Sequence, residues 1–199
     1  MHPPGRGDAL LIVDVQVDFL PGGALGISGG DAVLGPINRL LGAWRGHGLP
    51  VFMSRDWHPA GHCSFAAQGG PWPEHCVAGS PGAGFAAQLS IAATDIVISK
   101  ATLLGKDAYS ALDGTPLAQA LHERGIARLF IAGLATDYCV RATGLDARAA
   151  GLEVVVLVDA VCAVDVQPGD GERALARLAA AGCELATTTA LLRLLEHAP

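Results

Sequence analysis

The sequence ARLFIAGLATDYCV, residues 127–140, holds the pattern that decides the fold. Its first eight residues form an almost continuous apolar run, which is typical of a strand buried on both faces of a parallel sheet. Thr136 and Asp137 then precede a new apolar run and indicate the start of a helix. Cys139 is therefore expected in the first turn of a helix, just beyond a strand. There it is either a nucleophile or a small buried hydrophobic residue.

Apolar runs of the same kind recur along the chain and alternate with helical patterns. The other predicted strands are 9–15, 49–56, 94–100, 152–160 and 183–188. The predicted helices are 31–47, 116–124, 137–150, 171–181 and 189–197. Strands that alternate with helices predict an α/β fold, with a six-stranded parallel sheet and right-handed crossovers.

The composition narrows the class of protein. The chain has 199 residues, of which 51% are hydrophobic, so we expect one globular domain over 1–199. The net charge of -6, with scattered basic residues, argues against a nucleic-acid partner. No apolar run approaches the roughly 20 residues that span a bilayer, and we expect no membrane association. The first residues lack a signal-peptide layout, and the five cysteines include no CxxC pair, so we expect a cytoplasmic protein without a disulfide framework.

The stretch 57–89 breaks the alternation of strands and helices. It is rich in Gly, Pro and Ala and has no clear period. A long irregular segment inside a compact domain is usually functional or disordered. Its three histidines and two tryptophans argue against disorder, so we expect a functional loop region at about 56–89.

Polar residues fall at the ends of four successive predicted strands. They are Asp14, Asp56, Lys100 and Cys139. Taken singly, each has an ordinary interpretation: a loop or capping carboxylate, a solvated lysine, a buried cysteine. Because ligands of open α/β sheets bind at the carboxyl ends of the strands, their shared placement indicates one site.

The residues at these strand ends have a coherent chemistry. The helix dipole and a nearby lysine are expected to lower the pKa of the Cys139 thiol. A neighbouring carboxylate can carry a proton between a thiol and a leaving group. Backbone N–H groups at a strand-to-helix turn can stabilise an oxyanion. An aspartate, a lysine and a cysteine therefore suffice for acyl transfer through a thioester.

A second cluster lies in DWHPAGHCSF (56–65) and GPWPEHCV (70–77), which contain Asp56, His58, His62 and His75. In an extended segment, Asp56 and His58 point to the same side. A carboxylate with imidazoles suits zinc, iron or manganese, whereas loop histidines can also simply cap or be solvated. Cys63 and Cys76 lie beside these histidines, but without CxxC spacing they are a weak indication of a structural zinc site.

With these residues in view, the sequence resembles the nicotinamidase (pyrazinamidase) branch of the isochorismatase-like cysteine hydrolases. The resemblance covers nearly the whole chain. It rests on LLIVDVQVDFLPGGALGISGGD, SRDWHPAGHCSF, GGPWPEHCVAGSPGAGF, SKATLLGKDAYSALDGTPL and GLATDYCVRATGLDARAAG. It implies the isochorismatase-like hydrolase fold, a three-layer Rossmann-like sandwich, in agreement with the strand pattern.

The resemblance implies a role for each matching residue. Asp14 matches the catalytic acid/base, Lys100 the catalytic lysine and Cys139 the nucleophile. A cis peptide bond is implied between Leu134 and Ala135, with the N–H groups of Ala135 and Cys139 as the oxyanion hole. The resemblance also implies three metal ligands, Asp56, His58 and His75. His62 is implied as a fourth ligand or as a residue that supports the ligands without binding the metal. The implied pocket residues are Phe19, Leu25, Trp72, Tyr109 and Ala135.

The function implied by the resemblance is hydrolysis of nicotinamide, and of pyrazinamide, to the acid and ammonia in NAD salvage. We expect one divalent metal ion, zinc in the first place, with iron and manganese as alternatives. A homo-oligomer is compatible with the family. The alternatives are a carbamoylsarcosine or ureidoacrylate amidohydrolase, an isochorismatase, and a non-catalytic, metal-stabilised binding protein. The intact Asp14, Lys100 and Cys139 set argues against the last two.

Overall fold

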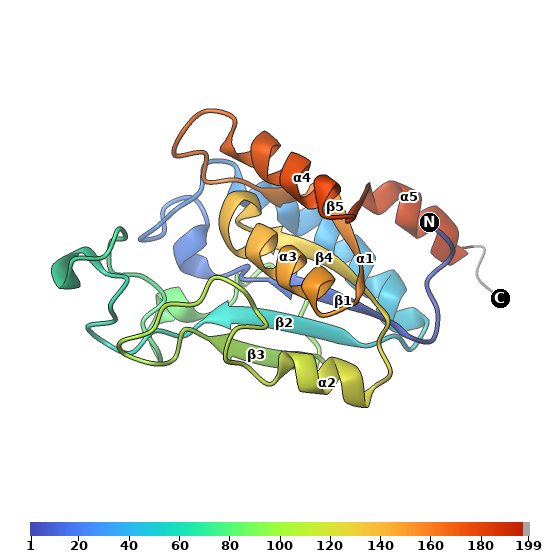
Figure 1. The fold of residues 1–199 in the computed structure, drawn as a ribbon, viewed down its shortest axis with the longest axis horizontal. Helices are drawn as coiled ribbons and strands as arrows, with labels where there is room; N and C mark the ends of the chain where they lie inside the picture. Colours follow the sequence, from blue (N-terminus) through green and yellow to red (C-terminus); the bar gives the residue numbers. More distant parts are fainter. Residues whose placement is uncertain (197–199) are drawn as a thin grey trace.

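The sheet has six strands, all parallel, in the order β3-β2-β1-β4-β5-β6 (Figure 1). The structure is a computed structural model and describes residues 1–196. The strands are β1 Asp8–Val13, β2 Val51–Asp56, β3 Ile96–Lys100, β4 Arg128–Leu134, β5 Glu153–Cys162 and β6 Glu184–Ala186. The predicted six-stranded parallel sheet is confirmed, with strand ends that differ from the prediction by a few residues.

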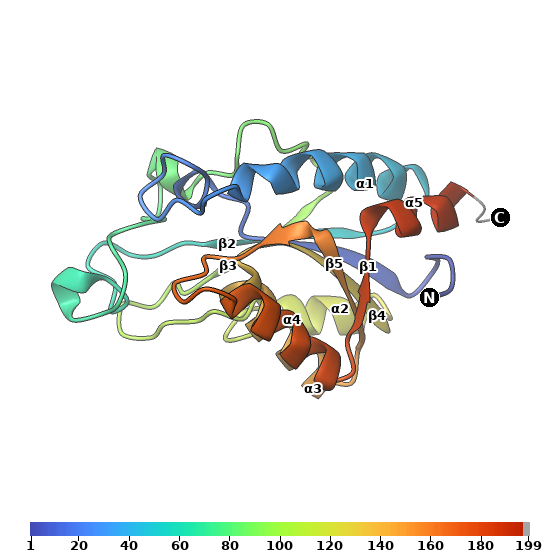
Figure 2. The same cartoon turned by 90° about the horizontal axis from the view of Figure 1, so that it is seen from above.

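Helices cover both faces of the sheet and make a three-layer sandwich (Figure 2). α1 Leu34–Gly46 and α5 Thr188–Glu196 lie on one face, and α2 Leu117–Glu123, α3 Arg141–Ala149 and α4 Asp170–Ala180 lie on the other. The last residue of the predicted helix 189–197 lies outside the described residues. Within residues 1–196, no helix combines the length and apolar character needed to traverse a bilayer.

Two predicted helices begin differently from the prediction. The predicted helix 31–47 starts as a 3-10 turn, Gly30–Val33, and α1 begins just before Pro36, which is tolerated in a first turn because it needs no hydrogen-bond partner for an N–H. The predicted helix 137–150 starts as a π-helical turn, Thr136–Val140, and continues as α3. Single π-helical turns occur frequently at functional sites.

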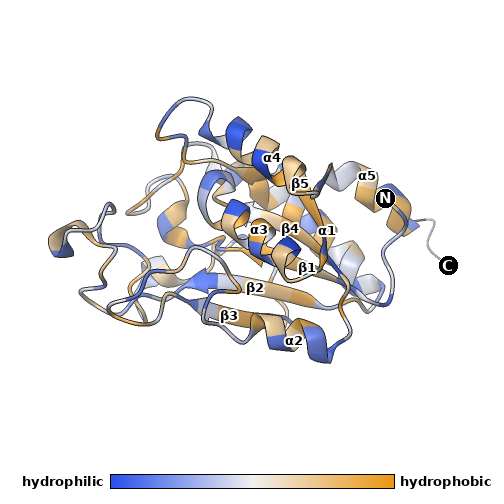
Figure 3. Cartoon of the chain, viewed as in Figure 1, coloured by the Kyte–Doolittle hydropathy of each residue, from blue (hydrophilic) through white to orange (hydrophobic). Residues whose placement is uncertain are grey.

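The core explains why the strands lack polar alternation. All six residues of β1 are buried, and alternate residues face opposite layers. Leu10 and Ile12 pack with Trp44 of α1, whereas Leu11 and Val13 pack with Leu178 of α4. Figure 3 shows the same arrangement, with hydrophobic strands inside and helices that carry polar residues on their outer side.

β1 and β4 are neighbours in the sheet although they are far apart in the sequence, and the strand order reverses between them. Gly133 permits their close approach at the carboxyl ends. Its φ is 118°, and a Cβ there would lie 2.1 Å from the carbonyl oxygen of Val13. In such sheets, the crevice at this reversal is the ordinary place for a ligand.

The stretch 57–89 is irregular, as expected, and lies beyond the carboxyl ends of the strands (Figure 1). It contains two 3-10 turns, Ala66–Gln68 and Pro81–Ala83. Isolated backbone bridges His58↔Val77 and Phe65↔Trp72 fold the stretch back on itself. These bridges bring the histidines of the stretch together without a helix or a long strand.

Candidate active site

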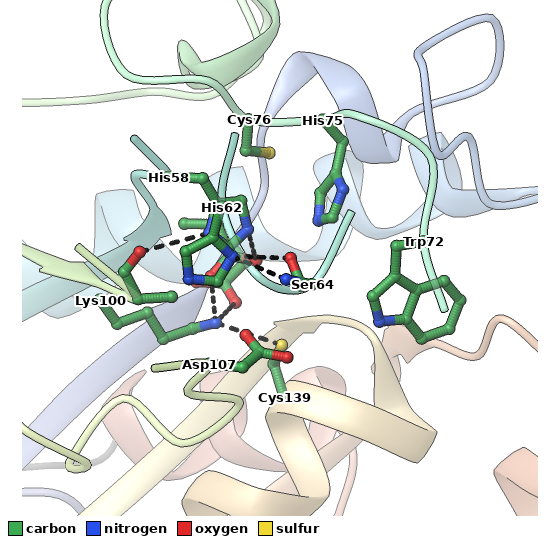
Figure 4. A network of polar contacts seen from close by, with 12 residues as sticks. His58, His62, Ser64, Trp72, His75, Cys76, Lys100, Asp107 and Cys139 are labelled. Carbon is green, nitrogen blue, oxygen red and sulfur yellow. Dashed lines mark hydrogen bonds and ion pairs between the residues drawn. The ribbon is translucent and has the colours of Figure 1, made fainter. Parts of the chain in front are cut away.

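The structure brings the four strand-end residues together around one ammonium group. The Nζ atom of Lys100, at the end of β3, lies 2.5 Å from Oδ1 of Asp56 and 3.0 Å from Oδ2 of Asp14. The same Nζ lies 3.4 Å from Sγ of Cys139 and donates to the carbonyl of Ala108 at 3.1 Å. Residues from the ends of β1, β2, β3 and β4 therefore share a single buried cluster. Figure 4 shows Lys100 and Cys139 of this cluster.

Asp14 is held in a fixed orientation. It is fully buried and has φ of 49°, in the left-handed region that residues other than glycine adopt rarely. Ser54 Oγ donates to its Oδ1 at 2.7 Å, and Lys100 lies against its Oδ2. Burial raises the pKa of the Asp14 carboxyl above its ordinary value, while the Lys100 ammonium works in the opposite direction. Burial and the Lys100 ammonium together therefore set the proton affinity of the Asp14 carboxyl.

Lys100 is charged in this environment. Burial acts to lower its pKa, but the carboxylates of Asp14 and Asp56 outweigh that effect and raise the pKa well above its ordinary value. A charged lysine with two carboxylates within hydrogen-bond distance satisfies the usual condition for burying an ammonium group.

The pKa of Cys139 differs from the sequence-based expectation. Burial raises the pKa of the thiol well above its ordinary value, Lys100 opposes this, and the negative charges of Asp14 and Asp56 add to it. The expectation of a lowered pKa is wrong because it considered the helix start and the lysine but not desolvation beside two carboxylates. The raised pKa favours the neutral thiol, so a nucleophilic role for Cys139 would need a base beside it.

The turn that carries Cys139 is anchored at both ends. The carbonyl of Ala135 accepts from the N–H groups of Tyr138 and Val140 at 3.1 Å and 3.0 Å. Asp137 accepts from the backbone N–H groups of 164 and 165, both at 2.9 Å, and so ties the turn to the loop after β5. The peptide bond between Leu134 and Ala135 is cis, as the resemblance implied.

Asp56, His58 and His75 form a candidate metal site: each offers a ligand atom, and these atoms lie within 4.8 Å of one another. His58 donates through Nδ1 to the carbonyl of Ala101 at 3.3 Å, and His75 donates through Nδ1 to that of Pro73 at 2.8 Å. Ring N–H bonds of this kind leave Nε2 available to a metal and fix the orientation of the ring.

Two further observations fit a metal at this place. Nε2 of His58 is buried and has no hydrogen-bond partner within the described part of the chain. A buried polar atom without a partner is costly unless a ligand engages it. Burial, followed by the charges of His75, His62 and Lys100, lowers the pKa of His58 to about 3, which keeps the imidazole neutral, the form that binds metals.

His62 lies behind these ligands. Its ring stacks on His58, with centroids 4.3 Å apart, and both of its nitrogens have other partners. Nδ1 is 2.7 Å from Ser64 Oγ, and Nε2 is 3.1 Å from the carbonyl oxygen of Lys106. This geometry favours a supporting partner over a fourth ligand. Among residues 1–196, neither Cys63 nor Cys76 joins a group with metal-ligand geometry.

Residues that the sequence reasoning missed hold the candidate metal ligands in place. Gln16 is fully buried, donates to the carbonyl of Asp56 at 2.8 Å and accepts from its N–H at 2.7 Å. Asp18 accepts from the N–H of Cys76 at 2.7 Å, next to His75. Both lie in the DVQVDF segment that carried the resemblance, but their partners are 40 and 58 residues away along the chain.

One pocket joins the thiol to the candidate metal site. All five residues expected to line it do so: Phe19, Leu25, Trp72, Tyr109 and Ala135. Trp72 donates through Nε1 to the Tyr109 hydroxyl at 2.9 Å and stands nearly perpendicular to the Tyr138 ring, 5.0 Å away. The aromatic side chains of the lining therefore give the pocket flat walls that can pack against a planar ring.

The pocket also has walls that the sequence reasoning did not identify. They are Ile27, Ser64, Asp107, Ala108, Tyr138 and Val164. Tyr138 could have been found from its position next to Cys139, and Asp107 from its position between Lys100 and Tyr109. Ile27 and Val164 carry no local signal, because only the folding of distant loops brings them to the site.

Comparison with known proteins places the chain among hydrolases. The isochorismatase domain model matches residues 8–190. The nicotinamidase of Escherichia coli (strain K12) is 39% identical over 200 residues, which cover 90% of this chain and 94% of that protein.

Solved structures agree with the match. The pyrazinamidase of Pyrococcus horikoshii in complex with zinc is 44% identical, has a TM-score of 0.87 and aligns over 91% of this chain and 99% of its own. PnC1 from L. infantum, in complex with nicotinate, is 40% identical with a TM-score of 0.87, over 96% of this chain and 97% of its own.

Proposed function

The chain belongs to the isochorismatase family, and on that basis we propose that it is a nicotinamidase that also hydrolyses pyrazinamide. It converts nicotinamide and water into nicotinate and ammonia. The observation that carries this function is one aromatic pocket lined by the Cys139 thiol and by Asp56, His58 and His75. A pyridine carboxamide offers an electrophilic carbon to the thiol and a ring nitrogen to the candidate metal site.

In the first half of the reaction, Sγ of Cys139 attacks the carboxamide carbon. The Asp14 carboxylate takes the thiol proton, since the resting thiol is neutral. The oxyanion that forms is stabilised by the N–H groups of Ala135 and Cys139 and by the nearby charge of Lys100. Asp14 then gives its proton to the departing nitrogen, the C–N bond breaks, and ammonia leaves a nicotinoyl thioester on Cys139.

In the second half, water attacks the thioester carbon while Asp14 accepts one proton from the water. The C–S bond breaks, the proton passes to the thiolate, and the product is the carboxylic acid, which ionises to nicotinate. The charged Lys100 keeps Asp14 and Cys139 in place during both halves, because it contacts both side chains.

Asp56, His58 and His75 would hold a divalent metal ion, and zinc fits this set of one carboxylate and two imidazoles. Such an ion would supply a Lewis-acid contact for the ring nitrogen and so orient the ring. The zinc complex of the P. horikoshii pyrazinamidase supports this assignment. His62 supports His58 by stacking on it rather than by binding the ion.

An assay of ammonia release from a panel of amides tests the function. We expect rapid hydrolysis of nicotinamide and pyrazinamide and none of N-carbamoylsarcosine or ureidoacrylate. Turnover of one of the last two with nicotinamide left intact would assign the chain to another amidohydrolase of the family. No ammonia from any amide, from protein loaded with zinc, iron or manganese, would favour a non-catalytic binding protein.

The Asp14→Asn variant tests the proposed base. The amide keeps the shape and can still accept from Ser54, but it cannot take a proton from the thiol. We expect kcat for nicotinamide to fall by at least about 100-fold, the low end of general acid–base catalysis. The exposed Asp146→Asn variant, on α3, is the control and should keep its kcat. A fall in kcat of less than about tenfold in Asp14→Asn would show that Asp14 is not the base that accepts the thiol proton.

The Lys100→Ala variant tests the influence of the lysine on its two neighbours. In the parent, the acid limb of kcat/KM should lie above the ordinary carboxyl value of 3.8, because burial raises the pKa of Asp14 and activity requires the ionised form. Removing the ammonium raises the pKa of both Asp14 and Cys139. The acid limb and the pH profile of Cys139 alkylation by iodoacetamide should therefore both move to higher pH. Unchanged pH profiles of kcat/KM and of alkylation would show that Lys100 does not lower the pKa of Asp14 or of Cys139.

A further inference from the structure

Asp107 stands at a fixed place in the wall of the catalytic pocket. It belongs to the loop after β3 and lines the same pocket as Cys139 and His58 (Figure 4). The carbonyl of the preceding residue, Lys106, lies 3.1 Å from Nε2 of His62. The carbonyl of the following residue, Ala108, accepts from Lys100 at 3.1 Å. The backbone on each side of Asp107 is thus held by a residue of the site.

The carboxylate of Asp107 lacks a cationic partner. It is half-buried, and its Oδ1 accepts from the N–H of Ala108 at 2.9 Å. Asp14 and Asp56 both contact the Lys100 ammonium, but within residues 1–196 no lysine, arginine or histidine forms an ion pair with Asp107. Its negative charge is therefore not neutralised by a neighbouring side chain.

The charges around the pocket influence whether it binds neutral or anionic ligands. Its lining contains the carboxylates of Asp56 and Asp107 and no lysine or arginine. The charge of Lys100, just behind the lining, is already engaged by Asp14 and Asp56. The reaction under the proposed function starts from a neutral amide and ends with a carboxylate at the same carbon. Substrate and product thus differ by one negative charge in a pocket that holds the unpaired charge of Asp107.

We propose that Asp107 is a specificity-determining residue that disfavours ligands with a carboxylate in this pocket. Its charge weakens the binding of the acid relative to the neutral amide, which limits product inhibition and speeds product release. The same repulsion disfavours small amides that carry a carboxylate, such as N-carbamoylsarcosine and ureidoacrylate. This proposal rests on the proposed function and extends it to the choice between neutral and anionic ligands.

The test measures the dissociation constants of nicotinate and nicotinamide by titration calorimetry. The protein is the metal-loaded Cys139→Ala variant, which binds ligand without turnover, with and without Asp107→Asn. Asparagine keeps an oxygen acceptor for the N–H of Ala108 and removes only the charge. A bound metal affects parent and variant alike, so the ratio of the two constants isolates the effect of Asp107.

We expect Asp107→Asn to lower the ratio of the nicotinate to the nicotinamide dissociation constant by about five- to tenfold at low salt. The constant for nicotinamide should change by less than about twofold, and the difference between the variants should shrink as salt is added. With Cys139 intact, the inhibition constant of nicotinate should fall by a similar factor. Glu74→Gln, an exposed carboxylate outside the pocket lining, is the control for net charge and should leave the ratio unchanged.

Three results would overturn the proposal. The first is that neither dissociation constant changes. The second is an equal change in both constants, which would make Asp107 a residue that positions the loop. The third is the same shift in Glu74→Gln, which would make the effect one of overall charge. Failure of the proposed function is a separate outcome, since the parent would then neither bind nor hydrolyse nicotinamide, and the proposal on Asp107 would fall with it.

Discussion

Replacement of Cys139 by alanine is expected to abolish nicotinamide hydrolysis, with a fall in kcat of at least about 10⁴-fold. In the proposed mechanism the reaction passes through a thioester on this sulfur, and no other cysteine lines the pocket. The fold should survive, because alanine is smaller than the buried thiol and the turn around it is anchored through Ala135 and Asp137. The measurement is ammonia release by protein whose circular dichroism and melting temperature match the parent.

Matched cysteine variants control for the loss of a thiol as such. Cys63→Ala and Cys162→Ala remove half-buried thiols that lie outside the pocket lining, and both should keep kcat within a few-fold of the parent. Mass spectrometry of protein quenched during turnover should find the nicotinoyl adduct on Cys139 alone. An active Cys139→Ala variant, or an adduct on another cysteine, would contradict the thioester mechanism.

The second large effect concerns the metal. His58→Ala or His75→Ala should weaken metal binding by at least about 100-fold and lose nicotinamide hydrolysis with it. The thiol should keep its reactivity, because Cys139 contacts Lys100 and not the imidazoles. Metal content by mass spectrometry and alkylation of Cys139 are the two readouts. His122→Ala, on the exposed side of α2, is the matched control and should retain metal and activity.

Two more comparisons sharpen the metal prediction. Benzamide, which lacks the ring nitrogen, should be hydrolysed at least about 10³-fold less efficiently than nicotinamide, since a site built for a polar atom strongly rejects an analogue without it. His62→Ala should weaken metal binding only modestly, because both nitrogens of His62 are engaged by Ser64 and Lys106. Full activity in metal-free protein would contradict the proposed role of Asp56, His58 and His75.

The site was partly predictable because its residues lie at strand ends. The apolar runs located the strands, and the rule that ligands bind at the carboxyl ends of parallel strands grouped Asp14, Asp56, Lys100 and Cys139. The loop histidines formed a second cluster, and the family resemblance added their role as metal ligands and the aromatic walls of the pocket. The contacts of Gln16 and Asp18 with the segments that carry Asp56 and His75 were not predicted, although both residues lie in the same segment as Asp14. Their function depends on partners 40 and 58 residues away, which no local pattern reveals.

The sequence by itself determined the parallel sheet, because short apolar runs that alternate with helical patterns are typical of strands covered by helices on both faces. It also determined which polar residues reach the reacting end. Only the tertiary structure decided the direction of the pKa shift of Cys139, the hydrogen-bond partners of His62 and the lack of a cationic partner for Asp107. A pKa and a hydrogen-bond partner depend on desolvation and on charges from distant segments, as in the burial that raises the pKa of the Cys139 thiol. Such neighbours exist only once the chain has folded.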